Sequence, residues 1–288
     1  MIPEAEIKST AARLGVEAMV VDLDYVLGCF LATLFRHPAS SDLAFKGGTC
    51  LKKCYYSDFR FSQDLDFTLI RSMRRGQIED LLDAVAAKAL DEWEIDFRAR
   101  PIWVEVVDDE YGKESYQVRL YYHSPILGRR RDPRSIQLDL TTSETIAFPL
   151  GPRAILHDYS DAGMLSDVRV PCYDLLEMAA EKIRALSGQR IHAISRDIYD
   201  LHELPRRHEI DLPRLTAALP GKWKVKGLAL EPPSIERFDS RREEFREDWE
   251  DNLKNLLPNT ARTSFEAAWD GARSFLTEIG RAWPKPKT

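Results

Sequence analysis

A short acidic strand behind a glycine pair is the feature that most limits the fold of this 288-residue chain. Over residues 64–70 the side chains alternate, with Asp64, Asp66 and Thr68 on one face and Leu65, Phe67 and Leu69 on the other. A period of two is typical of a half-buried strand. Upstream, residues 43–46 predict a second short strand, which turns at Gly47 and Gly48 into a helix over residues 49–56. This order of strand, glycine turn, helix and strand favours a mixed α and β fold.

The rest of the chain divides into a mixed first half and a nearly all-helical second half. Apolar periodicity predicts helices over residues 4–14, 16–36 and 76–93, and strands over 95–107, 115–123 and 135–141. The last two strands are expected to extend the sheet in antiparallel pairing. Further helices are expected over 173–187, 191–204, 212–219, 233–257 and 260–282. We therefore expect an α+β fold, with an α/β lobe over residues 1–165 and a helical C-terminal lobe over residues 166–288 that completes a cleft.

The composition is that of a soluble globular protein, with 44% hydrophobic and 31% charged residues. The net charge of −6 means that contact with nucleic acid would need local basic segments, such as residues 129–131, 206–207 and 222–226. A solvated surface run is the alternative for each segment, and the commoner one. The N-terminus has no signal-peptide pattern, and no uninterrupted run of 18 apolar residues occurs. We expect a cytoplasmic protein without a transmembrane helix.

Several common catalytic and metal-binding patterns are missing from the sequence. The six histidines have no metal-ligand spacing, and no G-x-S-x-G, Walker loop or G-x-G-x-x-G occurs, which argues against serine hydrolases, P-loop NTPases and dinucleotide-dependent dehydrogenases. Of the cysteines Cys29, Cys50, Cys54 and Cys172, the middle two are four residues apart, but no second pair completes a zinc site. The cysteines are expected to be reduced, buried thiols.

Asp64 and Asp66 are the candidate metal ligands, because carboxylates at positions i and i+2 of a strand project from the same face. The glycine turn at Gly47 and Gly48 lets backbone N–H groups approach a phosphate closely. A D-x-D pair alone is a weak signal, and the alternative is a glycine turn followed by an ordinary edge strand. The ordered combination favours a site for a nucleoside triphosphate.

A third carboxylate is expected on a neighbouring strand, and Asp139 is the best candidate. Its neighbours Ile136, Leu138 and Leu140 alternate with it and should face the core. Three aspartates that bridge two metal ions would activate an attacking hydroxyl and stabilise a leaving pyrophosphate. Oxygen ligands at an open site favour Mg²⁺ or Mn²⁺. A solvent-facing Asp139 is the alternative, and Glu105 is a weaker candidate for the third ligand.

Lys182 and two downstream aspartates are candidates for contact with the nucleotide. Lys182 shares a helical face with the apolar residues Leu175, Ala179 and Leu186. Burial of a lysine charge on an apolar stripe costs free energy unless the charge meets an anion or reaches solvent. Two interpretations of Lys182 therefore stay open, a contact with a triphosphate and a side chain that extends to solvent. On the next helix, Asp197 or Asp200 could pair with Lys182, orient the nucleotide, or form a surface pair.

These motifs together resemble the AbiEii/AbiGii toxin family of nucleotidyltransferases. The resemblance rests on K-G-G-T-x-L at residues 46–51, R-F-S-x-D-L-D-F at 60–67, E-K-I at 181–183 and R-D-x-Y-D-L at 196–201. The motifs occur in the family's order and span residues 46–204, more than half of the chain. The resemblance implies a fold like that of the DNA polymerase β-like nucleotidyltransferases, which is a small mixed sheet with flanking helices plus a helical C-terminal lobe.

The resemblance also implies roles for the candidate residues. Asp64 and Asp66 would bind metal with help from Asp139, and Lys182 would contact the triphosphate of the nucleotide. The expected phosphate cradle consists of Gly47, Gly48, Thr49 and Ser62. Of the two downstream carboxylates, Asp200 is expected to be catalytic and Asp197 structural.

The function implied by the resemblance is that of a toxin from a two-gene toxin–antitoxin or phage-defence system. The expected reaction is metal-dependent transfer of a nucleotide from an NTP to an RNA acceptor, the tRNA 3′ end, with release of pyrophosphate. The expected partners are the NTP, the RNA and a cognate antitoxin, and no membrane contact is expected. Residues 222–226 could hold the RNA. Two other readings stay open: a nucleotide-binding regulatory or partner-binding protein without turnover, and nucleotidyl transfer to a small-molecule acceptor.

Overall fold

The computed structural model describes residues 1–108, 114–124, 132–190 and 192–284, and its contacts divide into two compact units. The first unit comprises Met1–Ser143, Leu150–Cys172 and Leu256–Ala261. The second comprises Glu144–Pro149, Tyr173–Asn255 and Arg262–Thr288. Each unit has its own core. The basic run predicted at residues 129–131 lies outside the described residues.

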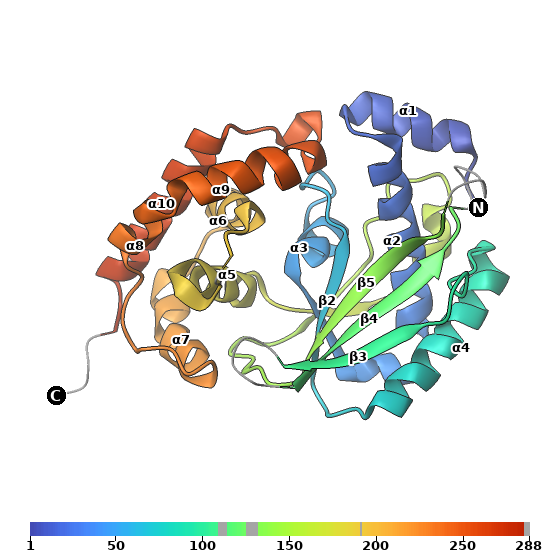
Figure 1. The fold of residues 1–288 in the computed structure, drawn as a ribbon, viewed down its shortest axis with the longest axis horizontal. Helices are drawn as coiled ribbons and strands as arrows, with labels where there is room; N and C mark the ends of the chain where they lie inside the picture. Colours follow the sequence, from blue (N-terminus) through green and yellow to red (C-terminus); the bar gives the residue numbers. More distant parts are fainter. Residues whose placement is uncertain (109–113, 125–131, 191, 285–288) are drawn as a thin grey trace. The chain divides into compact units, whose positions relative to one another are not determined.

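A seven-stranded mixed sheet organises the first unit (Figure 1), with the strand order β3-β4-β5-β2-β1-β7-β6. Its strands are β1 (Leu43–Lys46), β2 (Asp64–Leu69), β3 (Trp103–Asp108), β4 (Glu114–Tyr122), β5 (Arg134–Thr141), β6 (Gly151–Arg153) and β7 (Val170–Cys172). Most neighbours pair antiparallel, among them β3 with β4, and also β4 with β5, as expected for the last two predicted strands. The pairs β2–β5 and β1–β7 are parallel. The parallel pairing of β2 with β5 places the two acidic strands side by side.

Two long helices cover the apolar face of this sheet. They are α2 (Ala18–Arg36) and α4 (Arg75–Trp93), and α1 (Glu4–Leu14) packs against α2. The ring of Phe67 on β2 lies 6.1 Å from that of Phe35 on α2, and the indole N–H of Trp93 donates to Thr33 at 3.0 Å. Burial of a large apolar side chain contributes roughly 1.5–3 kcal/mol, so this face anchors the sheet. The carboxylates of β2 and β5 consequently occupy the opposite face.

Among the described residues, α2 is long and apolar enough to cross a membrane by length and composition. Most of it is buried inside the first unit. Its two aspartates are held there, Asp22 by Arg134 at 2.9 Å and Asp24 by Lys53 at 2.5 Å. Because buried charges need partners and these partners come from elsewhere in the same unit, α2 has the contacts of a core helix.

Helices make up most of the second unit. They are α5 (Leu175–Arg184), α6 (Ser195–Arg207), α7 (Leu212–Val225), α8 (Ile235–Ser240), α9 (Arg242–Asp248) and α10 (Phe265–Arg281). Helix α6 packs on α10, and α5 packs on α6 and α7. An aromatic cluster joins α8, α9 and α10, with the rings of Phe238 and Trp269 stacked 4.1 Å apart and Phe245 against the same tryptophan. The sheet and these helices together are the expected α+β fold.

Some predicted elements have different limits in the structure. Helix α7 runs through Pro220 to Val225, beyond the predicted end at residue 219, although a proline inside a helix costs about 3 kcal/mol. Tertiary contacts outweigh that cost, because Lys222 and Trp223 in the last turn are buried. The helix predicted over residues 233–257 is divided into α8, α9 and short turns. The three-residue strands β6 and β7 were not predicted, since so short a segment has no readable period.

Candidate active site

Asp64, Asp66 and Asp139 lie on one face of the β2–β5 pair. Asp66 is in register with Asp139, and Asp64 with Gln137. Side chains alternate along a strand, so residues in register on neighbouring strands project from the same face. All three carboxylates are partly exposed, whereas Leu65 and the other apolar residues between them are buried. The structure therefore brings together the three acidic residues that the sequence singled out.

The electrostatics of this face favour a bound cation. Burial, followed by the negative charges of Asp66 and Asp64, raises the pKa of Asp139 to about 7, against the opposing effects of Gln137 and Lys46. The Gln137 amide donates towards the two carboxylate oxygens of Asp139 at 3.4 and 3.3 Å. Carboxylate oxygens are the ligands that Mg²⁺ and Mn²⁺ prefer, and a divalent ion would offset this crowded negative charge. Carboxylate oxygens of this kind suit Mg²⁺ or Mn²⁺, and the three aspartates stay predicted ligands.

The glycine turn fits closely against the acidic face. Strand β1 ends at Lys46, which is in register with Asp66, and α3 (Gly47–Cys50) follows at once. Gly47 has a φ of 78°, and a β-carbon on it would lie 2.1 Å from Oδ2 of Asp66. A side chain at this position would displace the carboxylate. The helix begins two residues earlier than predicted because Gly47 makes the turn itself.

A buried arginine lies behind the second glycine of the turn. A β-carbon on Gly48 would lie 2.3 Å from the Nη2 atom of Arg60, which is 1% exposed. Arg60 also donates to the carbonyl of Phe61 at 3.2 Å. The sequence motif contains Arg60, but periodicity gave no reason to place its guanidinium beside the turn. The structure adds it as a positive charge close to the predicted phosphate cradle.

Thr49 and Ser62 are both buried in the first unit, at 1% and 7% exposure. The Thr49 hydroxyl donates to the main-chain carbonyl of Asp64. This bond ties the helix after the glycine turn to the first residue of the acidic strand. The geometry favours a positioning role for the Thr49 side chain over direct contact with a phosphate.

Glu105, the weaker candidate for the third carboxylate, lies too far from Asp66 for that role. It is in register with Gln117 on β4, which is in register with Asp139 on β5. Neighbouring strands are about 4.8 Å apart, so Glu105 is separated from Asp139 by roughly two such spacings. Asp139 alone of the two lies directly beside Asp66.

The predicted lysine and the downstream aspartates form a buried ionic cluster in the second unit. The Nζ atom of Lys182 lies 2.5 Å from Asp197 and 2.9 Å from Asp200, and Arg190 lies 3.1 Å from Asp197. Both carboxylates are at most 1% exposed. Burial opposes ionisation of Asp197, but the charges of Arg190 and Lys182 prevail and lower its pKa to about 2. Lys182 is thus bound to two carboxylates, and Asp197 carries an additional arginine partner.

Two predicted basic segments have partners within the protein. Lys222 is fully buried, with its Nζ atom 2.5 Å from Glu177 and 2.9 Å from Glu144. Arg207 lies 2.7 Å from Glu203. Lys222 is therefore not part of an exposed basic surface, because its charge is paired inside the second unit, and contact of residues 222–226 with RNA stays a prediction.

A pocket of about 150 Å³ lies elsewhere in the first unit. Its lining includes the cations Lys52 and Lys53 and the carboxylates Asp24 and Asp158. The two signs of charge balance, and none of the predicted site residues lines this pocket. It is separate from the carboxylate face of β2 and β5.

A family model described as nucleotidyl transferase AbiEii toxin of a Type IV toxin–antitoxin system matches residues 29–271. The chain belongs to the AbiEii family. The match includes the glycine turn, all three aspartates of the sheet and the Lys182 cluster. As a member of the AbiEii family the chain is a nucleotidyltransferase of the toxin type, and the family points to an NTP substrate and an antitoxin partner.

Solved structures share the fold of this chain over nearly its whole length. The nucleotidyltransferase toxin MenT4 from Mycobacterium tuberculosis is similar with a TM-score of 0.65 and 23% identity, over 98% of this chain and 93% of that one. A putative nucleotidyltransferase from Helicobacter pylori has a TM-score of 0.53 at 15% identity, over 92% and 96%. JHP933 from Helicobacter pylori has a TM-score of 0.54 at 15% identity, over 92% and 94%. No curated protein matches the sequence.

Proposed function

We propose that this AbiEii-family enzyme transfers a nucleotide from an NTP to an RNA acceptor, the 3′ end of tRNA, with Mg²⁺ or Mn²⁺ as cofactor. The cytoplasm is its proposed location, and a cognate antitoxin restrains it. The observation that carries the proposal is the register of Asp66 with Asp139, beside Asp64 and against the glycine turn. This arrangement supports the proposal of a cation site with a phosphate-binding turn beside it.

Asp64, Asp66 and Asp139 are the proposed metal ligands. These residues would hold a divalent ion, which would supply Lewis-acid activation of the acceptor hydroxyl and charge neutralisation at the leaving pyrophosphate. The chain keeps the ligands in place through contacts of its own. Gln137 orients Asp139, and the missing side chain of Gly47 leaves room for Asp66.

The proposed phosphate cradle consists of the turn at Gly47 and Gly48 with the buried segment that contains Arg60 and Ser62. The first N–H groups of a helix have no partner within the helix and favour anions, and glycines allow a phosphate to come close. Thr49 contributes by holding this helix against Asp64. Phosphoryl-type transfers depend mainly on such positioning and on charge stabilisation.

Lys182 and Asp200 are the proposed catalytic groups of the second unit. The order of the AbiEii motifs supports this assignment, in which Lys182 contacts the triphosphate of the NTP. Asp197 has two cationic partners and a pKa of about 2, so its proposed role is to hold Lys182 and Arg190 in place. Asp200, fully buried and paired with Lys182, is left as the catalytic carboxylate.

The test is to incubate the purified protein with each radiolabelled NTP, Mg²⁺ and total tRNA, beside the Asp66→Asn variant. We expect the wild-type protein, but not the variant, to label tRNA. We also expect expression of the wild-type protein to arrest growth without added drug. NTP binding without metal-dependent transfer would replace the proposal with a regulatory role. Labelling of small molecules, but not of tRNA, would show that the acceptor is a small molecule and that the reaction is still nucleotidyl transfer.

A further inference from the structure

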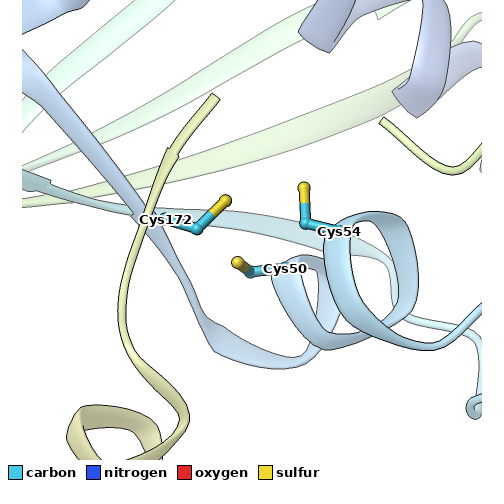
Figure 2. A group of neighbouring side chains, drawn as sticks. All are labelled: Cys50, Cys54 and Cys172. Atoms are coloured by element: carbon cyan, nitrogen blue, oxygen red, sulfur yellow. The ribbon is translucent and has the colours of Figure 1, made fainter. Parts of the chain in front are cut away.

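Two cysteines of one helical segment and a third from far along the sequence lie close together (Figure 2). Cys50 ends α3, Cys54 lies in the π-helical turn Leu51–Tyr55 that follows, and Cys172 ends β7. Their Sγ atoms all lie within 4.8 Å of one another, and the residues are at most 5% exposed. The sequence showed the first two at helical spacing, and the pairing of β7 with β1 at Phe45 brings the third.

The sulfur atoms lie close enough together for one small cation to bind all three. A metal ion bonded to three sulfurs at about 2.3 Å in a plane puts the sulfurs about 4 Å apart. Three thiols that merely fill a core need not converge on one point. Two of the three lie one helical turn apart on the same segment and the third faces them from a strand, so a single ion could reach all three.

A positive charge lies beside the segment that carries Cys54. The guanidinium of Arg153 lies 4.4 Å from the centre of the Tyr55 ring, next to Cys54 in the chain. Thiolate is the form that binds metal, and positive charges nearby reduce the cost of burying it.

We propose that Cys50, Cys54 and Cys172 form a binding site for a soft monovalent cation of the Cu⁺ class. Thiolate ligands select such ions. Structural zinc sites are closed by four protein ligands, and among the described residues no fourth histidine, cysteine or carboxylate joins this group. The site is separate from the carboxylate face and takes a different class of metal.

The position of the site links it to the glycine turn. The ion would tie β7 to the helical segment Gly47–Cys50, whose first residue packs against Asp66 and whose Thr49 bonds to Asp64. Metal bound only by the folded state stabilises that state. We therefore expect the loaded protein to melt at a higher temperature, whatever its transferase activity.

The test is an anaerobic titration of the reduced full-length protein with Cu⁺ against a coloured Cu⁺ chelator, with X-ray absorption on the product. The expected result is one Cu⁺ per chain with three sulfur ligands, and a rise in melting temperature. Cys54→Ser and Cys172→Ser should each lower the Cu⁺ affinity at least tenfold. Cys29→Ser, which removes a buried thiol of α2 outside the group, should keep wild-type affinity.

Several results would overturn the proposal. They are failure to hold Cu⁺ against the chelator, equal binding by the Cys54→Ser variant, and a preference for Zn²⁺ with an oxygen as fourth ligand. A disulfide between two of the three cysteines in protein purified without reductant, together with no metal uptake after reduction, would also overturn it. Cys54→Ala and Cys172→Ala, checked by circular dichroism, separate loss of the ligand from loss of the fold.

Discussion

Gly47 and Asp66 fit together so closely that a β-carbon on the glycine would lie 2.1 Å from the Oδ2 oxygen of the aspartate. The backbone of Gly47 is also in the left-handed region, with a φ of 78°. The glycine turn therefore shapes the acidic face directly, besides its proposed contact with phosphate.

Replacement of Gly47 by alanine should displace Asp66 and cost about 1–2 kcal/mol in backbone strain. We expect the kcat/KM for nucleotide transfer to fall at least about 100-fold, since misplacement of a reacting group by 1 Å can cost that much. Gly76→Ala is the matched control, because a β-carbon at Gly76 in α4 has open space around it. Activity of Gly47→Ala within twofold of wild type would contradict this view of the turn.

Asp139 makes the metal-free protein sensitive to pH. Its pKa of about 7 in the fold exceeds the ordinary value of 3.8, so the native state keeps a proton that the unfolded chain loses between these pH values. The free energy of unfolding should consequently fall as the pH rises through this window. In EDTA, we expect the melting temperature of wild type to drop more between pH 5 and pH 8 than that of Asp139→Asn.

Mg²⁺ provides the second arm of that experiment. At pH 8, added Mg²⁺ should raise the melting temperature of wild type by several degrees and leave Asp139→Asn nearly unchanged. If the melting temperatures of wild type and Asp139→Asn in EDTA changed equally with pH, the proton on Asp139 would not contribute to stability as we infer.

The two aspartates beside Lys182 should differ in what their loss affects. Asp197→Asn leaves Arg190 and Lys182 without a shared counter-charge, and loss of a buried ionic partner costs about 3–5 kcal/mol. Asp200→Asn leaves Lys182 paired with Asp197 and should destabilise less, while it abolishes nucleotide transfer. Urea denaturation measures the stability of each variant, and single-turnover assays measure its nucleotide transfer. If Asp200→Asn were more active and less stable than Asp197→Asn, the catalytic and structural roles of the two aspartates would be reversed.

The depressed pKa of Asp197 has its own signature at low pH. The stability that its charge contributes is fully present above the ordinary pKa of 3.8 and is lost as the pH falls through about 2. Acid denaturation of wild type should therefore show a step that Asp197→Asn lacks.

Lys222 should matter for stability and not for RNA binding. Lys222→Met leaves Glu177 and Glu144 buried without their lysine, at a cost of about 3–5 kcal/mol. Lys224→Met, at an exposed position two residues on, should change the free energy of unfolding by less than about 0.5 kcal/mol. Chemical denaturation compares the two variants, and an unchanged stability of Lys222→Met would show that the cluster contributes nothing.

Much of the fold follows from periodicity, and less of the site does. Alternation predicts that Asp66 and Asp139 lie on the polar faces of their strands, but only the parallel pairing of β2 with β5 makes them neighbours. Long-range pairing of this kind has no local pattern. For the same reason the sequence does not predict that Cys172 lies beside Cys50 and Cys54, because β7 is three residues long and joins β1 from far along the chain.

Charge alone is a poor guide to which lysines bind ligands. Lys182 and Lys222 both lie on helices with apolar faces, and both are paired with buried carboxylates of their own unit. The family motif assigns a ligand role to Lys182, which stays a prediction, and Lys222 was wrongly placed in a basic surface segment. Burial decides the difference between a surface charge and an internal one, and burial depends on packing that single-sequence patterns do not contain.

The parallel pairing of β2 with β5 also sets an order of events during synthesis. Asp66 leaves the ribosome 73 residues before Asp139, and the intervening chain forms α4, β3 and β4. Protein synthesis adds about 5–20 residues per second, so the acidic face stays incomplete for several seconds after its first strand has been made. A prematurely terminated chain that ends before Arg134 carries the D-x-D motif without Asp139 and without the second unit, so we expect such truncated products to have no nucleotidyltransferase activity.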